Sequence, residues 1–432
     1  MDSILLHNAA QIVSPKPGVM RGPELKQLSV HKNSSLFIED GVIQAIGPAK
    51  QMEERIAFQT RVVDVSGKCL LPGFVDAHTH LVFGGSREDE FARRCVGASY
   101  AELAQQGGGI MSTVRATRQM SKEQLIRQGL VYLQKAVHHG ITTMEIKSGY
   151  GLDEANELKI LQVIKELHVQ QPVELIATFL GAHAVPTGVT KVDYLEQLHR
   201  MLPQVASLAQ FCDVFCERDY FTADETRDIL REAARFGLKS RVHTNQFHSI
   251  GGIQAAIDAG AASVDHLEHL SDAEIAALAA TDMCATLLPG VSLFLNIPYA
   301  PGRKILDAGC IPVLATDFNP GSCMTLSMPM ILTLACTQMG FSMEEAIAAV
   351  TQNAAYSLGL EKIGCLEPGW QADVLILDSD NYQNLIYFFA EPQIEQVMKK
   401  GQFIYDRSLA WDIGGDLDEE SDDAESHKDL FA

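Results

Sequence analysis

The chain has 432 residues, 47% of them hydrophobic and 21% charged, which excludes a single small domain and fits a globular protein with a large core. Its formal net charge is −21, and this disfavours nucleic acid and anionic membranes as partners, because both require a basic surface. The chain has no run of about 18 apolar residues, so it predicts no membrane span.

The first ten residues lack the basic and apolar regions of a secretory signal. The nine cysteines are scattered through apolar segments without a tight framework. An odd number of scattered cysteines is typical of reduced thiols, so we expect a cytoplasmic protein.

Both ends of the chain show short strand-like runs separated by glycine and proline. These runs lie at residues 34–38, 41–47, 61–65, 372–377, 394–397 and 401–405. The simplest arrangement folds both ends together into one small β-sandwich domain, made of residues 1–70 and 365–407.

The middle of the chain, residues 71–364, alternates apolar β-rich runs with helix-like segments such as 123–137, 224–234 and 272–280. Eight strand candidates lie at residues 74–78, 142–146, 174–180, 211–216, 240–244, 262–266, 284–288 and 311–316. Several are almost continuously apolar, as expected for parallel strands buried on both faces. The alternation predicts an α/β fold, a (β/α)8 TIM-type barrel.

The last residues, 408–432, form an acidic tail. Seven of the ten residues from Asp416 to Glu425 are acidic, and Leu417 is their only large apolar residue. Such a segment cannot bury enough apolar surface to order itself, so we expect a disordered, solvated tail.

The strongest local motif is Asp76-Ala77-His78-Thr79-His80, at the end of the first predicted barrel strand. Residues two apart in a strand point to the same side, so both imidazoles can reach one metal ion. In a barrel they would lie at the C-terminal mouth, where active sites are built. A His-x-His pair is weak by itself, and ordinary polar residues explain it equally well.

Three later residues change that balance, because each is a ligand-type residue at or next to the end of an apolar run. They are His243, His266 and Asp317, in the fifth, sixth and last predicted strands. Nitrogen and oxygen ligands with an open position suit a divalent metal that activates water. We predict metal ligands at His78, His80, His243 and Asp317. Asp317 would also accept the proton of the water, and His266 would either act as general acid–base or hold the water in line.

The segment from Leu71 to His80 resembles the first-strand motif of the amidohydrolase superfamily. Four further segments, 107–110, 145–152, 179–186 and 316–322, look specifically like the imidazolonepropionase family, and the likeness runs from about Gly41 to Tyr405. The resemblance implies one zinc or iron ion per subunit and suggests a homodimer.

The resemblance also implies a set of substrate-binding residues for a small molecule with a carboxylate tail. These are Arg87, Tyr150, His183, Gln246, Asn319, Gly321 and Ser322, of which Gln246 also counts among the catalytic residues with His266 and Asp317. Arg87 offers a planar fork for a carboxylate. Because Glu88, Asp89 and Glu90 follow it directly, Arg87 could instead form a simple ion pair on the surface.

The implied reaction is hydrolysis of the ring C–N bond of 4-imidazolone-5-propanoate to N-formimidoyl-L-glutamate. Two alternatives stay open. An aromatic deaminase would need a glutamate where this chain has Gln246, which cannot accept and return a proton. An inactive scaffold relative would be expected to lose metal ligands, which are all present here. The fourth predicted strand has no lysine to bridge two metals, and Lys147 reads as an ion-pair partner.

Overall fold

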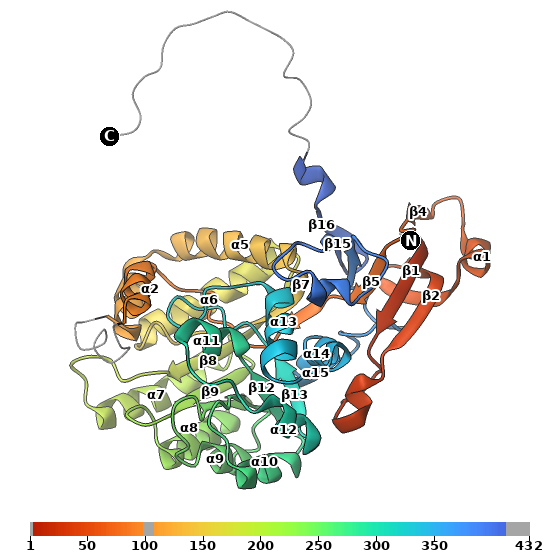
Figure 1. The fold of residues 1–432 in the computed structure, drawn as a ribbon. Coiled ribbons are helices and arrows are strands. Elements are labelled where there is room, and N and C mark those ends of the chain that lie inside the picture. Colours follow the sequence, from red (N-terminus) through yellow and green to blue (C-terminus); the bar gives the residue numbers. More distant parts are fainter. Residues whose placement is uncertain (1–2, 98–107, 412–432) are drawn as a thin grey trace, which may run out of the picture.

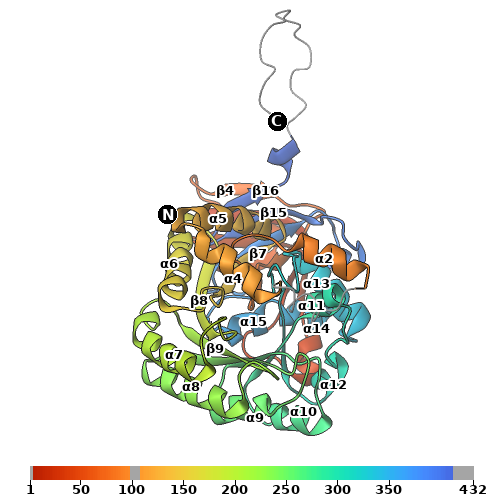
Figure 2. The ribbon, with the colours of Figure 1, turned by 90° about the vertical axis from the view of Figure 1, so that its left-hand side faces the viewer.

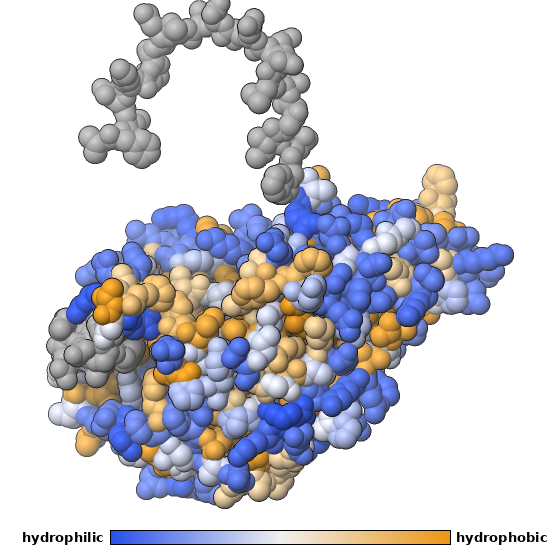
Figure 3. Space-filling view, viewed as in Figure 1, coloured by the Kyte–Doolittle hydropathy of each residue, from blue (hydrophilic) through white to orange (hydrophobic). Residues whose placement is uncertain are grey.

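The computed structural model describes residues 3–97 and 108–411. It contains two eight-stranded sheets, one built from both ends of the chain and one from its middle (Figure 1). Within the described part, no helix has the length and apolar character needed to cross a membrane. Figure 3 shows a mainly hydrophilic surface on one face, with hydrophobic areas scattered over the barrel.

The middle sheet is a barrel of eight parallel strands in sequence order. The strands are β6 (Phe74–Asp76), β7 (Ile141–Lys147), β8 (Glu174–Ala182), β9 (Phe211–Cys216), β10 (Lys239–Thr244), β11 (Ser263–His266), β12 (Cys284–Leu287) and β13 (Ile311–Leu314). Nearly every residue in them is buried, as expected when helices cover the outside of a parallel sheet. The barrel closes just beyond the first and last strands, where the backbone N–H of His80 donates to the carbonyl of Phe318 at 2.9 Å.

Helices surround this barrel (Figure 2). They are α2 (Glu88–Cys95), α4 (Ile110–Gln119), α5 (Lys122–His138), α6 (Glu154–Gln170), α7 (Lys191–Val205), α8 (Ala223–Arg235), α9 (Gly252–Asp258), α10 (Asp272–Ala279), α11 (Pro289–Leu295), α12 (Gly302–Asp307), α13 (Met328–Gln338), α14 (Met343–Ala349) and α15 (Gln352–Ser357). Several begin with a capping box, in which a Ser or Thr accepts from the third helical N–H and a Glu or Gln reaches back. Ser121 starts α5 in this way and Thr222 starts α8.

The second sheet joins the two ends of the chain. Its strands are β1 (Ser3–Ser14), β2 (Ser29–Glu39), β3 (Val42–Pro48), β4 (Arg61–Asp64), β5 (Cys69–Pro72), β14 (Val374–Leu377), β15 (Ile394–Lys399) and β16 (Gln402–Asp406). The turn between β2 and β3 bonds to the segment before β14, because the N–H of Ala372 donates to the carbonyl of Gly41 at 2.9 Å. The enclosed apolar core draws on both ends of the chain, for example Leu36 and Ile376. The predicted fold class, a barrel with a small β-sandwich, is therefore confirmed.

The two sheets are packed tightly together. Apolar residues of both belong to one continuous cluster, and the ammonium of Lys399 on β15 donates to Thr143 on β7 at 3.2 Å. We propose that the sheets mark two domains, residues 1–70 with 365–407 and residues 71–364. Residues 408–411 form the short 3-10 helix η3 (Ser408–Trp411), and the acidic stretch from Asp416 onward lies outside the described residues.

All eight predicted barrel strands are present, with small differences at their ends. Strand β9 has the predicted bounds, whereas β6 ends at Asp76 instead of residue 78, and β13 ends at Leu314 instead of residue 316. Both of these strands lead into the C-terminal mouth, where the backbone leaves the sheet to carry polar side chains.

Candidate active site

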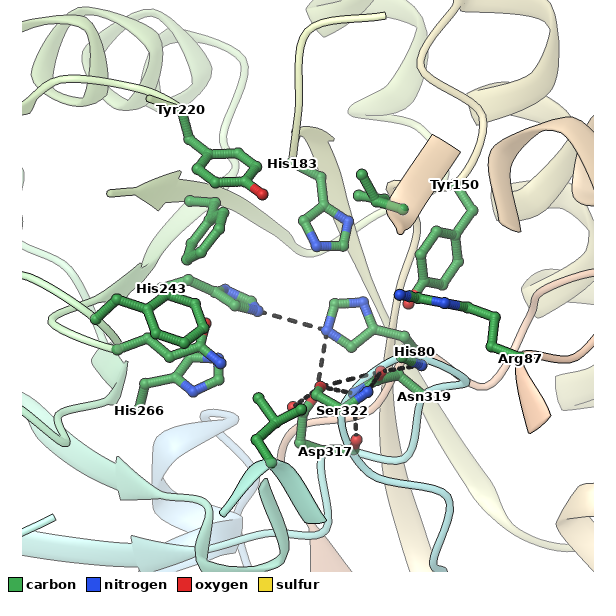
Figure 4. A pocket seen from close by; sticks show the side chains of 16 residues that line it. His80, Arg87, Tyr150, His183, Tyr220, His243, His266, Asp317, Asn319 and Ser322 are labelled. Atoms are coloured by element: carbon green, nitrogen blue, oxygen red, sulfur yellow. Dashed lines mark hydrogen bonds and ion pairs between the residues drawn. The ribbon is translucent and has the colours of Figure 1, made fainter. Parts of the chain in front are cut away.

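The predicted site residues gather around one pocket at the C-terminal mouth of the barrel (Figure 4). Its lining residues are His80, Arg87, Ile110, Tyr150, His183, Phe215, Tyr220, His243, Gln246, Phe247, His266, Leu295, Asp317, Asn319, Gly321 and Ser322. Three aromatic residues here, Phe215, Tyr220 and Phe247, had no distinguishing pattern in the sequence.

His78 and His80 lie beyond the end of β6, so strand alternation is not what brings them together. Instead the segment is held on both sides. The backbone N–H of Thr79 donates to Glu145 Oε2 at 3.3 Å, and the N–H of Asp317 donates to the carbonyl of His78 at 3.0 Å. These bonds fix the two imidazoles beside Asp317.

Three imidazoles and one carboxylate converge at this point. Oδ1 of Asp317 lies 3.4 Å from Nε2 of His78 and 3.3 Å from Nε2 of His80. Nε2 of His243 lies 3.4 Å from Nε2 of His80. Within the described residues, Nε2 of His78 and Oδ1 of Asp317 are buried without a hydrogen-bond partner. A cation bound between these atoms would satisfy them.

Two further carboxylates stand behind the imidazoles. Nδ1 of His78 lies 2.7 Å from Oδ2 of Asp265, and Nδ1 of His243 lies 2.9 Å from Oδ2 of Asp213. Because an ionised carboxylate only accepts, Nδ1 of His78 carries its hydrogen toward Asp265 and Nδ1 of His243 carries its hydrogen toward Asp213. In the neutral form, which is the form that binds a metal, each imidazole presents the lone pair of its Nε2 to the site.

Asp213 and Asp265 belong to a group that we call the inner charge cluster. Its members are Glu145, Lys147, Asp213, Arg241 and Asp265, all buried inside the barrel. Burial alone would raise the pKa of Asp213, but His243 and Lys147 hold it well below its usual range. Burial likewise opposes ionisation of Asp265, yet Arg241 and His78 keep its pKa low.

The site attracts positive charge. Burial and Lys147 oppose protonation of His78, but its contacts with Asp265 and Asp317 raise the pKa of His78 to about 9. Burial would raise the pKa of Asp317, and the neighbouring His78 and His80 lower it well below normal instead. Asp317 is therefore an ionised carboxylate, the form that binds a cation.

His266 ends β11 beside these residues. Its ring centroid lies 5.4 Å from that of His243 and 5.8 Å from that of His78, and its Nδ1 lies 3.5 Å from Oε1 of Glu268. Its φ is +88°, and Asp317 has φ +50°, so both residues adopt a left-handed backbone that side chains rarely take. Such strained backbone concentrates at functional sites.

Arg87 lies across the pocket from His266 (Figure 4). Its side chain is only 6% exposed, and its Nε and Nη2 donate to Oε2 of Glu90 at 3.0 and 2.7 Å. The other oxygen of Glu90 accepts from the N–H of Gly109 at 3.1 Å. The ion pair that the sequence left open is thus present, but it is largely withdrawn from solvent and orients a guanidinium that lines the pocket.

Tyr150 and His183 line the wall above His80. The His183 ring stacks on that of His80 at 5.2 Å, and its Nδ1 donates to the carbonyl of Gly149 at 3.1 Å, which leaves Nε2 as an acceptor. The loop that carries Tyr150 is held by Glu157, whose buried carboxylate accepts three backbone N–H bonds, from residues 149, 151 and 152.

Gln246 lies on the pocket wall, whereas the neighbouring Asn245 supports the loop from behind. The amide nitrogen of Asn245 donates to the carbonyl of His269 at 2.7 Å and to Oε1 of Glu274 at 2.9 Å. Glu217 holds the same loop by accepting from the N–H of Phe247 at 2.9 Å. Gln246 therefore faces the pocket from a fixed backbone.

The loop after Asp317 carries the remaining predicted residues. Oδ1 of Asn319 accepts from the backbone N–H groups of Gly321 and Ser322, both at 2.8 Å, and its amide nitrogen donates to the carbonyl of Asp317 at 2.7 Å. Asn319 thus shapes this loop as well as lining the pocket. Ser322 lies 3.5 Å from Oδ2 of Asp317 through its hydroxyl.

Comparison with known proteins fits this geometry. A model of the amidohydrolase family matches residues 69–404. The imidazolonepropionase of Geobacillus sp. is 42% identical over 422 residues, covering 94% of this chain and 98% of its own length. The imidazolonepropionase of Streptococcus pyogenes is also 42% identical, with coverage of 94% and 98%. The chain belongs to the imidazolonepropionase family of amidohydrolases.

Solved structures share the fold of this amidohydrolase. Guanine deaminase of E. coli superposes with a TM-score of 0.73 at 17% identity, covering 94% of this chain and 99% of its own. A mutant atrazine chlorohydrolase of Arthrobacter aurescens, complexed with zinc and atraton, gives a TM-score of 0.73 at 17% identity, covering 93% and 95%. Family membership and the His and Asp groups together indicate a divalent metal in the amidohydrolase site.

Sequence reasoning missed the carboxylates of this amidohydrolase site that orient its histidines. Asp213 interrupts the otherwise apolar strand β9, and the other charged residues, Glu145, Lys147, Arg241 and Asp265, are completely buried in neighbouring barrel strands. A charge inside a buried strand must be paired or hydrogen-bonded, so this pattern was available as a sign of an interior polar cluster.

Replacing Asp265 by asparagine should weaken metal binding by this amidohydrolase. The amide lacks the negative charge that fixes His78, and it leaves Arg241 without its carboxylate, so we expect a loss of about 10- to 100-fold in metal affinity. A chelator-competition titration with Zn²⁺ would measure it. The control is Asp272→Asn, at a side chain that is 85% exposed. Equal affinity in the two variants would rule out an orienting role for Asp265.

Proposed function

We propose that this amidohydrolase hydrolyses the ring C–N bond of 4-imidazolone-5-propanoate and releases N-formimidoyl-L-glutamate. The observation that carries the proposal is the presence, in one pocket, of a His and Asp metal-type group and the buried Arg87 guanidinium on the opposite wall. The first suits hydrolysis and the second suits the propionate tail. The nearly full-length likeness to imidazolonepropionases supports the same substrate.

One zinc or iron ion per subunit would be held by His78, His80, His243 and Asp317. The donor set suits such an ion, because imidazole and carboxylate groups are preferred ligands of zinc and iron. The inner charge cluster and Asp317 together contain four carboxylates and two cationic side chains, which leaves two negative charges for one divalent ion. When bound, the ion would supply Lewis acidity that lowers the pKa of water.

Asp317 and His266 then have different roles in the reaction. Asp317 accepts a proton from the attacking water, whose oxygen adds to the ring carbonyl carbon. His266, on the neighbouring strand end, stabilises the oxygen that gains negative charge. The ring C–N bond breaks as Asp317 returns the proton to the departing nitrogen. Gln246 hydrogen-bonds the ring, and Tyr150 and His183 hold it in place from the wall above.

Arg87 would bind the propionate, and Gly321 makes room for it. A methyl group at Gly321 would overlap Nη1 of Arg87, so only glycine lets the guanidinium lie against this loop. We therefore expect Gly321→Ala to displace Arg87. A charge-assisted hydrogen bond contributes about 1.5–3 kcal/mol, so KM should rise about 10- to 100-fold with little change in kcat. Steady-state kinetics on the imidazolone would measure both.

The matched control for that substitution is Gly47→Ala on β3, where a methyl group meets only the flexible ends of Met52 and Gln51. This variant should keep the wild-type KM. Arg87→Ala should raise KM at least as much as Gly321→Ala does. An unchanged KM in both pocket variants would remove Arg87 from substrate binding.

A direct assay separates this proposal from its alternatives. The purified protein is incubated with 4-imidazolone-5-propanoate and, separately, with a panel of aminated rings. Formation of N-formimidoyl-L-glutamate, identified by mass spectrometry, supports the proposal. Ammonia release from an aminated ring without turnover of the imidazolone would make the protein a deaminase. That outcome is disfavoured by Gln246, an amide where a deaminase needs a carboxylate. No turnover and no bound metal would indicate a scaffold.

The proposal extends to a cytoplasmic homodimer. All nine cysteines lie in the described part of the chain and none of them forms a disulfide, which supports a reducing compartment. Light scattering of the purified protein would test the subunit number.

A further inference from the structure

Lys147 lies inside the barrel, beneath the pocket, and is completely buried. Its ammonium is surrounded by three carboxylates, at 2.7 Å from Glu145 Oε1, 2.9 Å from Asp213 Oδ2 and 3.7 Å from Asp265 Oδ2. Such burial is expensive for a charged lysine unless its partners compensate fully. Neither substrate nor the proposed metal ligands require a lysine here, so its presence needs another reason.

The space that this ammonium occupies has the ligands of a metal site. Asp213, His243 and Asp265 offer ligand atoms that all lie within 4.8 Å of one another. Because His243 directs its Nε2 to the first site, the ligands of this second position would be the carboxylates of Glu145, Asp213 and Asp265, which suit a divalent cation. Lys147 already contacts all three of these carboxylates, so its ammonium stands where such a cation would compete for the same oxygens.

We infer that the Lys147 ammonium fills a second cation position and so keeps this amidohydrolase site at one metal ion. The inference rests on the proposed metal site. In this role Lys147 is a positioning residue. It holds Asp213 beside His243 and, with Arg241, compensates the charge of Asp265 beside His78. A second metal at this position would take the same carboxylates as ligands and free the imidazoles from them.

The charges explain why a lysine serves this purpose. With Lys147 in place, the inner charge cluster and Asp317 carry two net negative charges, which one divalent ion neutralises. Without Lys147 a further negative charge and an emptied volume lie next to three carboxylates. Uncompensated buried charge of this kind favours uptake of another cation.

The test counts metal ions in Lys147→Ala. The metal-free protein is dialysed against Mn²⁺ in a buffer without small monovalent cations, and bound Mn²⁺ is measured by atomic absorption and electron paramagnetic resonance. We expect one ion per subunit in the wild type and two in the variant. If Lys147→Ala does not fold, Lys147→Ala/Glu145→Gln removes one of the uncompensated carboxylates and should also bind two. One ion in the folded variants would overturn the inference.

A matched control is Lys399→Ala. Lys399 is another buried lysine, 2.9 Å from Asp373 and 3.3 Å from Glu174, but it lies between the two sheets and away from the pocket. This variant should bind one Mn²⁺ per subunit. Two ions would mean that any emptied lysine position gains metal, and the inference would fail. A wild type that binds no stoichiometric Mn²⁺ would instead contradict the proposed function itself.

Discussion

Asp317→Asn should abolish nearly all turnover of the imidazolone. In the proposed function, the substitution removes both the negative charge that would bind the cation and the group that would accept the proton of water. Asparagine tolerates the left-handed backbone of this position, φ +50°, so the fold should be kept. A general base contributes about 10²–10⁴-fold to the rate. Because the variant would also lose a proposed metal ligand, we expect kcat to fall by about 10⁴-fold.

Two measurements check that result. The decay of the substrate's ultraviolet absorbance gives kcat, and mass spectrometry of the acid-digested protein gives the metal content. Asp307→Asn is the control, because that side chain is 68% exposed on α12 and pairs only with Arg303 within the described residues. Retention of more than about a tenth of the wild-type kcat would exclude Asp317 as the proton acceptor.

His266→Asn is the second substitution with a large expected effect. We expect kcat to fall by about 10²–10³-fold, because the developing negative oxygen loses its hydrogen-bond donor. Asparagine again suits the backbone, since His266 has φ +88°. The metal content should stay at the wild-type value, because the four proposed ligands remain.

Metal content is the deciding quantity for His266. His78, His243 and His266 also bring ligand atoms within 4.8 Å of one another, so the geometry allows His266 a place in the metal coordination. Loss of the metal from His266→Asn would assign it there and leave the acid–base role without support. The control is His269→Asn, three residues further on and exposed, which should keep the activity.

The barrel could be predicted because its strands are short apolar runs that alternate with amphipathic helical segments. Phe211–Cys216 is apolar enough that its bounds were predicted correctly, whereas the first and last barrel strands were predicted two residues too long. Phe74–Asp76 is followed by His78 and His80 in an apolar context, so the sequence gives no mark where pairing stops. The stop is set by bonds to Glu145 and Phe318, which are distant in the chain.

The choice of site residues followed from strand ends, and the structure brings His78, His80, His243 and Asp317 together. Their roles stay predictions. The partners of these residues could not be predicted from the sequence. The register of β9 and β10 places Asp213 near His243, and closure of the barrel brings Asp265 on β11 to His78, which follows β6. The partner of Arg87 could not be predicted either. Three acidic residues, Glu88, Asp89 and Glu90, are near it in sequence, and only the structure shows that Glu90 binds it and that the pair is largely withdrawn from solvent.

Because the barrel closes between its first and last strands, the site can form only after most of the chain has been synthesised. His78 and His80 leave the ribosome early, but Asp317 follows only after about seven further strands, and β14 to β16 later still complete the sheet begun by β1. The nascent protein therefore cannot assemble its cation site until almost three quarters of its length is synthesised. Contacts this far apart in sequence also slow folding. A product truncated before residue 317 would lack both Phe318, which accepts the bond from His80 that closes the barrel, and the proposed carboxylate ligand Asp317.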